Sequence, residues 1–332
     1  MRPEYELRLA TRAAHLYWVE NMRQADIAAR INVSQAGVSR LLKRAQREGI
    51  VTVSITPPRG SHHQLEAQLA QSLGLEEVII TDAPDDSEAA IIASVGDAAA
   101  QYLEATLQSG DHIGISSWSS FLLSMSDQLR ESRQLSAERV VQLMGGMSNG
   151  GVEHLAESLT LQLARQLHAH PAFMHVAGIA SSAAACQVMC EEPYVRDTIQ
   201  LFDHLTVALL GIGTLEPSRF LARSGNTFSD TELADLAASG AVGDVCLRFF
   251  DAQGRLVDHP LNQRVVAISP ETLQRVPRLI GVAGGAQKIE AIRAAALGGW
   301  VRVLVTDTFT AERLAAQTVT EPIVPSATSL AP

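Results

Sequence analysis

The chain has 332 residues, 46% of them hydrophobic, which is more than one typical domain requires. It contains no apolar run of about 18 residues, and its first residues lack the apolar segment of a signal peptide, so we expect neither a membrane span nor export. Three cysteines are too few for a disulfide framework. These features argue against membrane proteins and disulfide-rich secreted proteins, and they predict a two-domain cytoplasmic protein.

Charge divides the sequence into a head, residues 1–60, and a body, the remainder. The head contains ten Lys and Arg against five Asp and Glu, whereas the body contains 16 against 31. A head of net charge +5 on a body of net charge −15 is expected if only the head approaches phosphate groups. Charge alone leaves open the alternative that the arginines only keep a small helical segment soluble.

Helical spacing of apolar residues predicts three helices in the head, over residues 6–20, 24–31 and 35–48. Asn32 can adopt the left-handed conformation that ends the second helix, and Ser34 is a good N-cap for the third. This arrangement predicts a helix-turn-helix, in which the N-terminal part of the third helix enters the major groove of DNA. The alternative is a three-helix module that docks on another protein.

The outward side chains of this unit are the predicted contacts to double-stranded DNA. Gln and Arg can pair with base edges, and Lys and Arg reach phosphates. Gly37 inside a helix normally costs about 1 kcal/mol relative to Ala, and a close approach to DNA is one reason to retain it. The predicted DNA-binding residues are Gln24, Ser34, Gln35, Ala36, Ser39, Arg40, Lys43, Arg44 and Arg47.

The segment after the third helix connects the head to the body. Residues 50–55 alternate in polarity and predict a strand or short wing, which makes the head winged-helix-like. Pro57 and Gly60 predict a linker, in which His62 and His63 are expected to be solvated rather than bound to a metal. The predicted domains are therefore 1–56 for DNA binding, 57–63 for the linker, 64–317 for effector binding and 318–332 for a polar tail.

The body alternates short apolar strands with helices, which predicts a mainly parallel sheet covered on both faces, a Rossmann-like α/β fold. The predicted strands cover residues 78–81, 112–115, 140–144, 173–176, 205–210, 245–250, 279–283 and 301–305. The predicted helices cover residues 64–73, 87–108, 118–131, 152–168, 181–189, 229–239, 286–298 and 308–316. In such a sheet, ligands lie at the carboxyl ends of the strands, where turns lead into helices.

Three turns after predicted strands are candidate effector-binding elements. A serine-rich turn opens a helix, so its hydroxyl and backbone N–H groups can hold an anion. Glycine turns follow two further strands, and each is a weak signal by itself because glycines end strands in many proteins. The predicted residues in these turns are Ser116, Ser117, Trp118, Ser119, Ser120, Gly145, Gly211 and Gly213.

Lys288 and Asp244 complete the predicted effector site. Lys288 follows Gly284 and Gly285 in the first turn of a predicted helix, where a cation opposes the helix dipole unless an anion binds. It is one of only two lysines among 26 basic residues, and the alternative is an ordinary surface lysine. Asp244 opens another strand and can accept hydrogen bonds from sugar hydroxyls, or else serve only its own turn.

The cysteines offer no metal site. Cys186 and Cys190 lie four residues apart on a predicted helix and therefore share a face. No histidine or third cysteine is suitably spaced, so we expect small buried residues there. We predict no metal and no cofactor.

Taken together, these residues resemble the SorC family of sugar-responsive transcriptional regulators over nearly the whole chain. The matching segments are 38–42, 49–51, 240–244, 248–251, 281–285 with Lys288, and 305–307. The resemblance implies an effector domain similar in fold to sugar-phosphate isomerases but without isomerase activity, in a homodimer or homotetramer. It also implies DNA affinity that changes when a phosphorylated sugar or polyol binds.

The resemblance also implies roles for the candidate site residues. Residues 116–120 and Lys288 would hold the phosphate, and Asp244 and the Gly211 turn would contact the sugar. Trp118 departs from the glycine and threonine pattern of the family's first loop, which would narrow the pocket or change its preference.

The sequence thus predicts a transcriptional regulator, with no enzymatic activity. One alternative is a sugar-phosphate isomerase-type enzyme with an accessory DNA-binding head, for which Asp244 is the only candidate base. The other is an interaction module without a small-molecule site.

Overall fold

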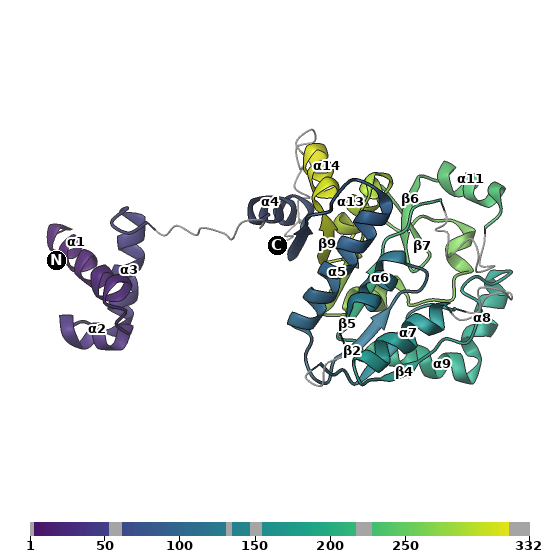
Figure 1. Ribbon diagram of the computed structural model, residues 1–332, viewed down its shortest axis with the longest axis horizontal. Helices are drawn as coiled ribbons and strands as arrows, with labels where there is room; N and C mark the ends of the chain where they lie inside the picture. The colour runs from purple at the N-terminus through teal and green to yellow at the C-terminus, as the bar shows by residue number, and fades with distance from the viewer. Residues whose placement is uncertain (1–2, 53–61, 131–134, 147–154, 217–227, 319–332) are drawn as a thin grey trace, which may run out of the picture. The chain divides into compact units, whose positions relative to one another are not determined.

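The computed structural model describes residues 3–52, 62–130, 135–146, 155–216 and 228–318, which form two compact units that correspond to the head and the body (Figure 1). No described helix is long and apolar enough to cross a membrane. Each unit has its own apolar core.

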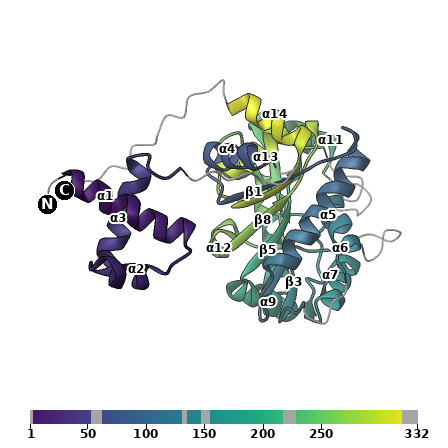
Figure 2. The same ribbon diagram turned by 60° about the vertical axis from the view of Figure 1, so that its left-hand side comes forward.

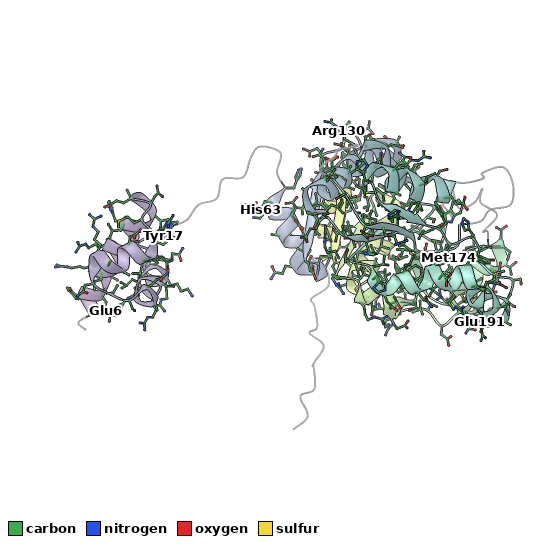
Figure 3. All side chains as sticks on the ribbon, turned by 90° about the horizontal axis from the view of Figure 1, so that it is seen from below. Glu6, Tyr17, His63, Arg130, Met174 and Glu191 are labelled. Carbon is green, nitrogen blue, oxygen red and sulfur yellow. The ribbon has the colours of Figure 1, made fainter. Side chains whose placement is uncertain are left out.

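Three α-helices and a short π-helical segment form the head. They are α1 (Pro3–Ala14), η1 (His15–Val19), α2 (Gln24–Ile31) and α3 (Gln35–Arg47). The first predicted helix therefore changes from α to π hydrogen bonding near its end, and Tyr17 in the π-helical segment is exposed (Figure 3). The buried residues that join the helices are Ala13, Leu16, Ile27, Val38 and Leu42.

Local signals set the turn between α2 and α3. Asn32 has φ 56° and ends α2, while the Ser34 hydroxyl accepts a hydrogen bond from the Gly37 N–H at 3.1 Å and caps α3. These contacts confirm the predicted turn of the helix-turn-helix. Each joins residues only a few positions apart, so a local pattern in the sequence was enough to predict it.

The segment after α3 differs from its prediction. Ile50 and Val51 form a turn that packs on small buried residues of α1 and α3, rather than the first part of a strand. Residues 53–55 of the predicted wing and 57–61 of the predicted linker lie outside the described residues. His62 and His63 belong to the body, since His63 begins a helix and His62 Nε2 lies 2.9 Å from Asp82 Oδ1.

A seven-stranded sheet, in which every neighbouring pair is parallel, forms the centre of the body. Its strands lie in the order β1-β9-β8-β5-β2-β3-β4. They are β1 (Glu77–Thr81), β2 (His112–Ile115), β3 (Arg139–Gln142), β4 (His170–Ala172), β5 (Val207–Gly211), β8 (Arg278–Val282) and β9 (Val303–Asp307).

Helices cover both faces of this sheet (Figure 2). One face packs on α5 (Glu88–Thr106), α6 (Ser120–Gln128) and α7 (Leu155–Gln166). The other packs on α4 (His63–Leu73), α13 (Ile289–Leu297) and α14 (Thr308–Thr318). Along β5, side chains alternate between the two apolar clusters, which is why its sequence is apolar at every position from Val207 to Leu210.

Four further helices and three 3-10 turns lie in the described part of the body. They are the helices α8 (Ala183–Glu191), α9 (Pro193–Gln200), α11 (Asp230–Ala238) and α12 (Pro270–Arg275), and the 3-10 turns Leu201–His204, Pro260–Gln263 and Ala286–Lys288. All eight helices predicted in the body are present within about three residues, but α9 and α12 were not predicted.

Two predicted strands are wrong. Residues 173–176 lie beyond β4, which ends at Ala172. The predicted strand 245–250 is instead an antiparallel hairpin of β6 (Ala241–Val245) and β7 (Arg248–Asp251), outside the main sheet. Its two-residue turn is Cys246 and Leu247, with φ of 53° and 60°. Glycine or asparagine usually occupies such positions, so the sequence carried no turn signal there.

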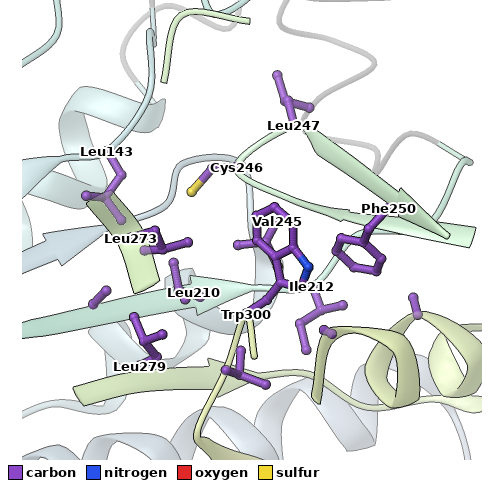
Figure 4. Packing of buried hydrophobic residues seen from close by; sticks show 14 of the residues in the cluster. Leu143, Leu210, Ile212, Val245, Cys246, Leu247, Phe250, Leu273, Leu279 and Trp300 are labelled. Atoms are coloured by element: carbon purple, nitrogen blue, oxygen red, sulfur yellow. The ribbon is translucent and has the colours of Figure 1, made fainter. Parts of the chain in front are cut away.

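The hairpin packs on the sheet through an apolar cluster (Figure 4). Among the residues of this cluster are Leu143, Leu210, Ile212, Val245, Cys246, Phe250, Leu279 and Trp300. Trp300 Nε1 donates to the Gly254 carbonyl at 2.7 Å, just beyond β7. Gly254 has φ +73°, and a Cβ there would clash with the Ala294 carbonyl, so this close approach requires glycine.

Candidate functional site

The exposed face of α3 carries most of the side chains predicted to bind DNA. Six of the nine are exposed: Ser34, Gln35, Ala36, Arg40, Lys43 and Arg47. Ser39 is half-buried, and Gln24 is half-buried at the first position of α2. The positive charges therefore lie on the side of α3 opposite the core residues Val38 and Leu42, where a phosphate backbone can reach them.

Two predicted DNA contacts are already engaged within the head. Arg44 Nη1 pairs with the Glu6 carboxylate, and its Nε lies 3.7 Å from Glu48 Oε1. The Ser34 hydroxyl accepts from Gly37 as the cap of α3. Arg44 thus ties α1 to α3, a role that the sequence prediction did not include.

The strand order of the body places a topological switch point, where ligands bind in open α/β sheets, between β2 and β5. From β2 the chain continues outward to β3 and β4, and it then returns to β5 on the other side of β2 and continues to β8 and β9. Because the loops leave in opposite directions, the carboxyl ends of the two strands are the expected ligand position, which we call the crevice between β2 and β5. Ser116, directly after β2, meets Gly211, the last residue of β5: its Oγ accepts from Gly211 N at 2.9 Å.

The serines of the predicted turn have different hydrogen-bond partners. Ser119 caps α6 by accepting from Leu122 N at 3.3 Å, and a Cβ at Gly211 would lie 2.7 Å from its Oγ. Ser117 Oγ instead accepts from the buried Gln142 amide at 3.2 Å. The buried Ser116 and the half-buried Ser119 therefore lie beside the end of β5, and a hydroxyl that accepts a hydrogen bond keeps its own O–H as a donor.

Other predicted site residues lie elsewhere or play another part. Trp118 has φ 67° and is 8% exposed within the apolar core, and its effect on the effector pocket stays a prediction. A Cβ at Gly145 would lie 2.6 Å from the carbonyls of Val176 and Ala177, so this glycine permits close backbone packing. Ser120 is half-buried in the first turn of α6.

Asp244, on β6, is brought to the end of β5 by a backbone bridge. Gly213 N donates to the Asp244 carbonyl at 2.9 Å, and Asp244 N donates to the Gly213 carbonyl at 3.1 Å. The Asp244 carboxylate also accepts from Leu247 N at 2.8 Å, which stabilises the left-handed hairpin turn. Burial raises the pKa of Asp244 to about 6, against the Leu247 N–H and the Lys288 charge, which lower it.

Lys288 ends the 3-10 turn directly before α13, rather than lying in the first turn of that helix, and its ammonium contacts the segment after β5. Its Nζ donates to the Ile212 carbonyl and lies 5.6 Å from the centre of the Phe121 ring. Burial lowers the pKa of Lys288, while the nearby Asp244 carboxylate raises it. The ammonium is therefore desolvated and close to the bridge that holds Asp244.

The glycine turn before Lys288 is supported by residues that the site prediction left out. Gly285 N donates to Thr310 Oγ1 at 2.7 Å, and Thr310 N donates to the fully buried Asp307 carboxylate at 3.0 Å. A Cβ at Gly284 would clash with that carboxylate. Asp307 was noted only as part of the family pattern. Its contact to Thr310 spans three residues, but Gly285 and Thr310 lie 25 residues apart, so no spacing rule would have connected this support to the glycine turn.

The crevice thus combines one ammonium, one carboxylate and two hydroxyls within a network of backbone groups. Such a set can bind a small molecule with hydroxyl groups and one anionic group. Among the described residues, no cluster of three His, Cys, Asp or Glu could hold a metal ion. A helix-turn-helix with a basic face, joined to an α/β domain with this crevice, defines a ligand-responsive DNA-binding regulator.

Comparison with known proteins agrees with this class. The family model described as "Putative sugar-binding domain" matches residues 59–316. The chain therefore belongs to this sugar-binding family, in which its relatives are transcriptional regulators of the SorC type.

Three relatives show the extent of the similarity. The chain is 30% identical to the deoxyribonucleoside regulator of Bacillus subtilis (strain 168), over 92% of this chain and 96% of the relative. It is 28% identical to the erythritol catabolism regulatory protein EryD of Brucella abortus (strain 2308), over 93% and 96%. The crystal structure of the full-length sorbitol operon regulator SorC from Klebsiella pneumoniae superposes with a TM-score of 0.70 at 30% identity, covering 94% of this chain and 99% of that one.

These findings confirm the predicted family, the α/β fold class with its helix-turn-helix head, and the function as a transcriptional regulator. The alternative of an isomerase-type enzyme finds no support, since these relatives are named as regulators. The roles of individual residues in DNA and effector binding stay predictions.

Proposed function

We propose that α3 binds operator DNA and that a phosphorylated sugar or polyol, bound in the crevice between β2 and β5, changes the affinity for that operator. The convergence of Lys288, Asp244 and Ser116 on the 211–213 turn supports this assignment. The deoxyribonucleoside, sorbitol and erythritol named for the relatives are or contain polyhydroxylated molecules of the size such a crevice would take.

The phosphate is assigned to Lys288. A desolvated ammonium whose hydrogen-bond partner among the described residues is a backbone carbonyl gains more from an anionic ligand than an exposed lysine does. The N–H groups at the start of α13 and α6 add to this preference for an anion. Asp244 and the Ser116 hydroxyl then meet the hydroxyl groups of the sugar.

Transmission to the head follows from a shift between two populations of the protein. An effector that replaces the Lys288–Ile212 contact favours one arrangement of the 211–213 turn and the β6–β7 hairpin. In a homodimer or homotetramer, this preference would change the spacing of the paired heads. The spacing decides how well the heads fit an operator with two-fold symmetry. We expect this regulation to take place in the cytoplasm.

The two lysines of the chain provide a matched test. An operator is first selected from random duplexes by the wild-type protein, and affinity is then measured with and without phosphorylated and unphosphorylated deoxyribose, sorbitol and erythritol. Lys288→Ala should lower the affinity for the effector about 10- to 100-fold and so remove the effector response. The affinity for the operator should stay unchanged. Lys43→Ala should do the opposite and weaken operator binding about equally across sequences, as expected for a phosphate contact.

Three outcomes would contradict the proposal. A normal effector response of Lys288→Ala would remove this residue from the site. Equal responses to the phosphorylated and unphosphorylated forms would contradict the proposal that the effector is phosphorylated. A protein whose melting temperature is unmoved by every compound would be better described as an interaction module.

A further inference from the structure

Helix α8 carries two thiols on one face, outside the crevice and the DNA-binding surface. Cys186 is 8% exposed, and Cys190, four residues later, is half-buried. Residues four apart in a helix lie one above the other, so the two sulfur atoms are neighbours. Neither thiol is used by the function proposed above.

A buried guanidinium lies beside this pair. Cys186 Sγ donates to the Val265 carbonyl at 3.4 Å, and Arg248 Nη2 donates to the same oxygen at 3.2 Å. Arg248 Nη1 donates to the Asn262 carbonyl, while its buried Nε has no hydrogen-bond partner among the described residues. A positive charge at this position stabilises a thiolate on Cys186.

The acidity of the pair agrees with that geometry. The pKa of Cys186 is lowered to about 7, chiefly because Cys190 donates a hydrogen bond to it, with Arg248 acting in the same direction against desolvation. Burial raises the pKa of the third thiol, Cys246. One thiol is thus reactive near neutral pH, a second stands next to it, and the third is inert.

We propose that Cys186 and Cys190 form an oxidation site that is sensitive to peroxides. The Cys186 thiolate attacks one peroxide oxygen and breaks the O–O bond, which yields a sulfenic acid and releases water or an alcohol. The Cys190 sulfur then attacks the Cys186 sulfur, forms the disulfide and releases water. Two thiols are oxidised by one peroxide, which is reduced.

The disulfide cannot form in an undisturbed α8. The Cβ atoms of residues four apart in a helix are separated by about 5–6 Å, whereas a disulfide holds them at about 3.8 Å. The last turn of α8, which ends at Glu191, must therefore unwind, and the Cys186 contact to Val265 is lost. Because Arg248 in β7 shares that carbonyl, oxidation loosens the hairpin that carries Asp244.

The test uses the full chain treated with hydrogen peroxide, followed by alkylation and mass spectrometry of the cysteine peptides. We expect an intramolecular Cys186–Cys190 disulfide to form at least tenfold faster than Cys246 is modified in the same molecules. The rate should rise about tenfold from pH 6 to pH 8, because the thiolate fraction of a group with a pKa near 7 does so, whereas an ordinary thiol would show a nearly hundredfold rise. In the Cys190→Ser variant, oxidation should stop at a sulfenic acid on Cys186, which a dimedone probe traps.

Hydrogen exchange of residues 241–251 tests the structural consequence. We expect faster exchange in the oxidised wild type and no change on oxidation of Cys190→Ser or Cys190→Ala. Equal reactivity of the three cysteines, or a disulfide only after denaturation or between chains, would overturn the oxidation site. Unchanged exchange in the disulfide form would overturn its connection to the hairpin.

Discussion

The two lysines of this protein lie in opposite environments, and the contrast corresponds to the two roles that we propose for them. Lys43 is exposed on α3, whereas Lys288 is half-buried, donates to the Ile212 carbonyl and lies over the Phe121 ring. In the head, positive charge is presented to solvent by a regular helix. In the body, a single charge is held by contacts between segments far apart in sequence, so its environment depends on the entire fold.

The glycines show the same difference and give the largest predicted effect. Gly254→Ala places a methyl group against the Ala294 carbonyl at a positive φ, and we expect a loss of about 3 kcal/mol. For a domain of this size, that corresponds to a fall of roughly 6–12 °C in the melting temperature of the body. Scanning calorimetry checks this.

Gly240→Ala is the matched control for that prediction. Gly240 also has a positive φ, +86°, but a Cβ there would meet nothing within 4 Å. It should cost only the conformational term of about 1 kcal/mol. If both variants melted at the same temperature, the close approach of Gly254 to α13 would not matter for stability.

Asp244 gives the second effect, which appears as a dependence on pH. Since the pKa of Asp244 is raised to about 6 in the folded protein, the native state binds more protons than the unfolded state between about pH 4 and pH 6. The stability of the body should therefore fall as pH rises through this window and remain at the lower level above it. The total change attributable to Asp244 is on the order of 2–3 kcal/mol.

Asp244→Asn isolates that contribution. The amide oxygen can still accept from Leu247 N but does not titrate, so the variant should be more stable than the wild type at pH 7 and about equal to it near pH 4. Calorimetry from pH 4 to pH 8 measures the difference between the two proteins. A difference that does not vary with pH would mean that the carboxylate has an ordinary pKa.

Two arginines of α3 sharpen the comparison on the side of the head. Arg40 is exposed, whereas Arg44 is paired with Glu6. Arg40→Ala should weaken operator binding about 10- to 100-fold, the range for loss of a base contact, and leave the head folded. Arg44→Ala should cost less than about 1 kcal/mol of head stability, because its ion pair is partly exposed. Fluorescence anisotropy and hydrogen exchange of α1 distinguish the two roles, and an unchanged affinity of Arg40→Ala would contradict the assignment of α3 as the recognition helix.

The smallest effect is expected at Gly37. A Cβ there would lie 3.3 Å from Ser34 Oγ and 3.5 Å from Val33 Cβ, a fit that needs only a small adjustment. Gly37→Ala should therefore stabilise the head by up to about 1 kcal/mol while weakening operator binding. A stabilised head with full operator affinity would show that DNA does not approach the backbone at Gly37. The Gly49→Ala variant, which lies outside the predicted DNA-binding surface, is the reference for operator binding.

Predictions succeeded where the signal was local. Asn32 and Ser34 mark the turn of the helix-turn-helix, and their contacts span only a few residues, so α2 and α3 were located within one residue. They failed where a distant segment decided the outcome. The Cys246–Leu247 turn has no turn-forming residues and is held by the Asp244 carboxylate and by packing on the sheet, so a hairpin was taken for a single strand.

Two units, a helix-turn-helix, the parallel α/β class and a lysine at a helix start could be predicted from the sequence alone, because helical spacing, caps and apolar strands act over a few residues. The contacts that each of these side chains makes depend on the tertiary structure. It buried Trp118, joined Ser116 to Gly211 and placed Lys288 on the Ile212 carbonyl, 76 residues away in sequence. These contacts depend on strand order, which is set by the packing of the complete sheet rather than by any short stretch of residues.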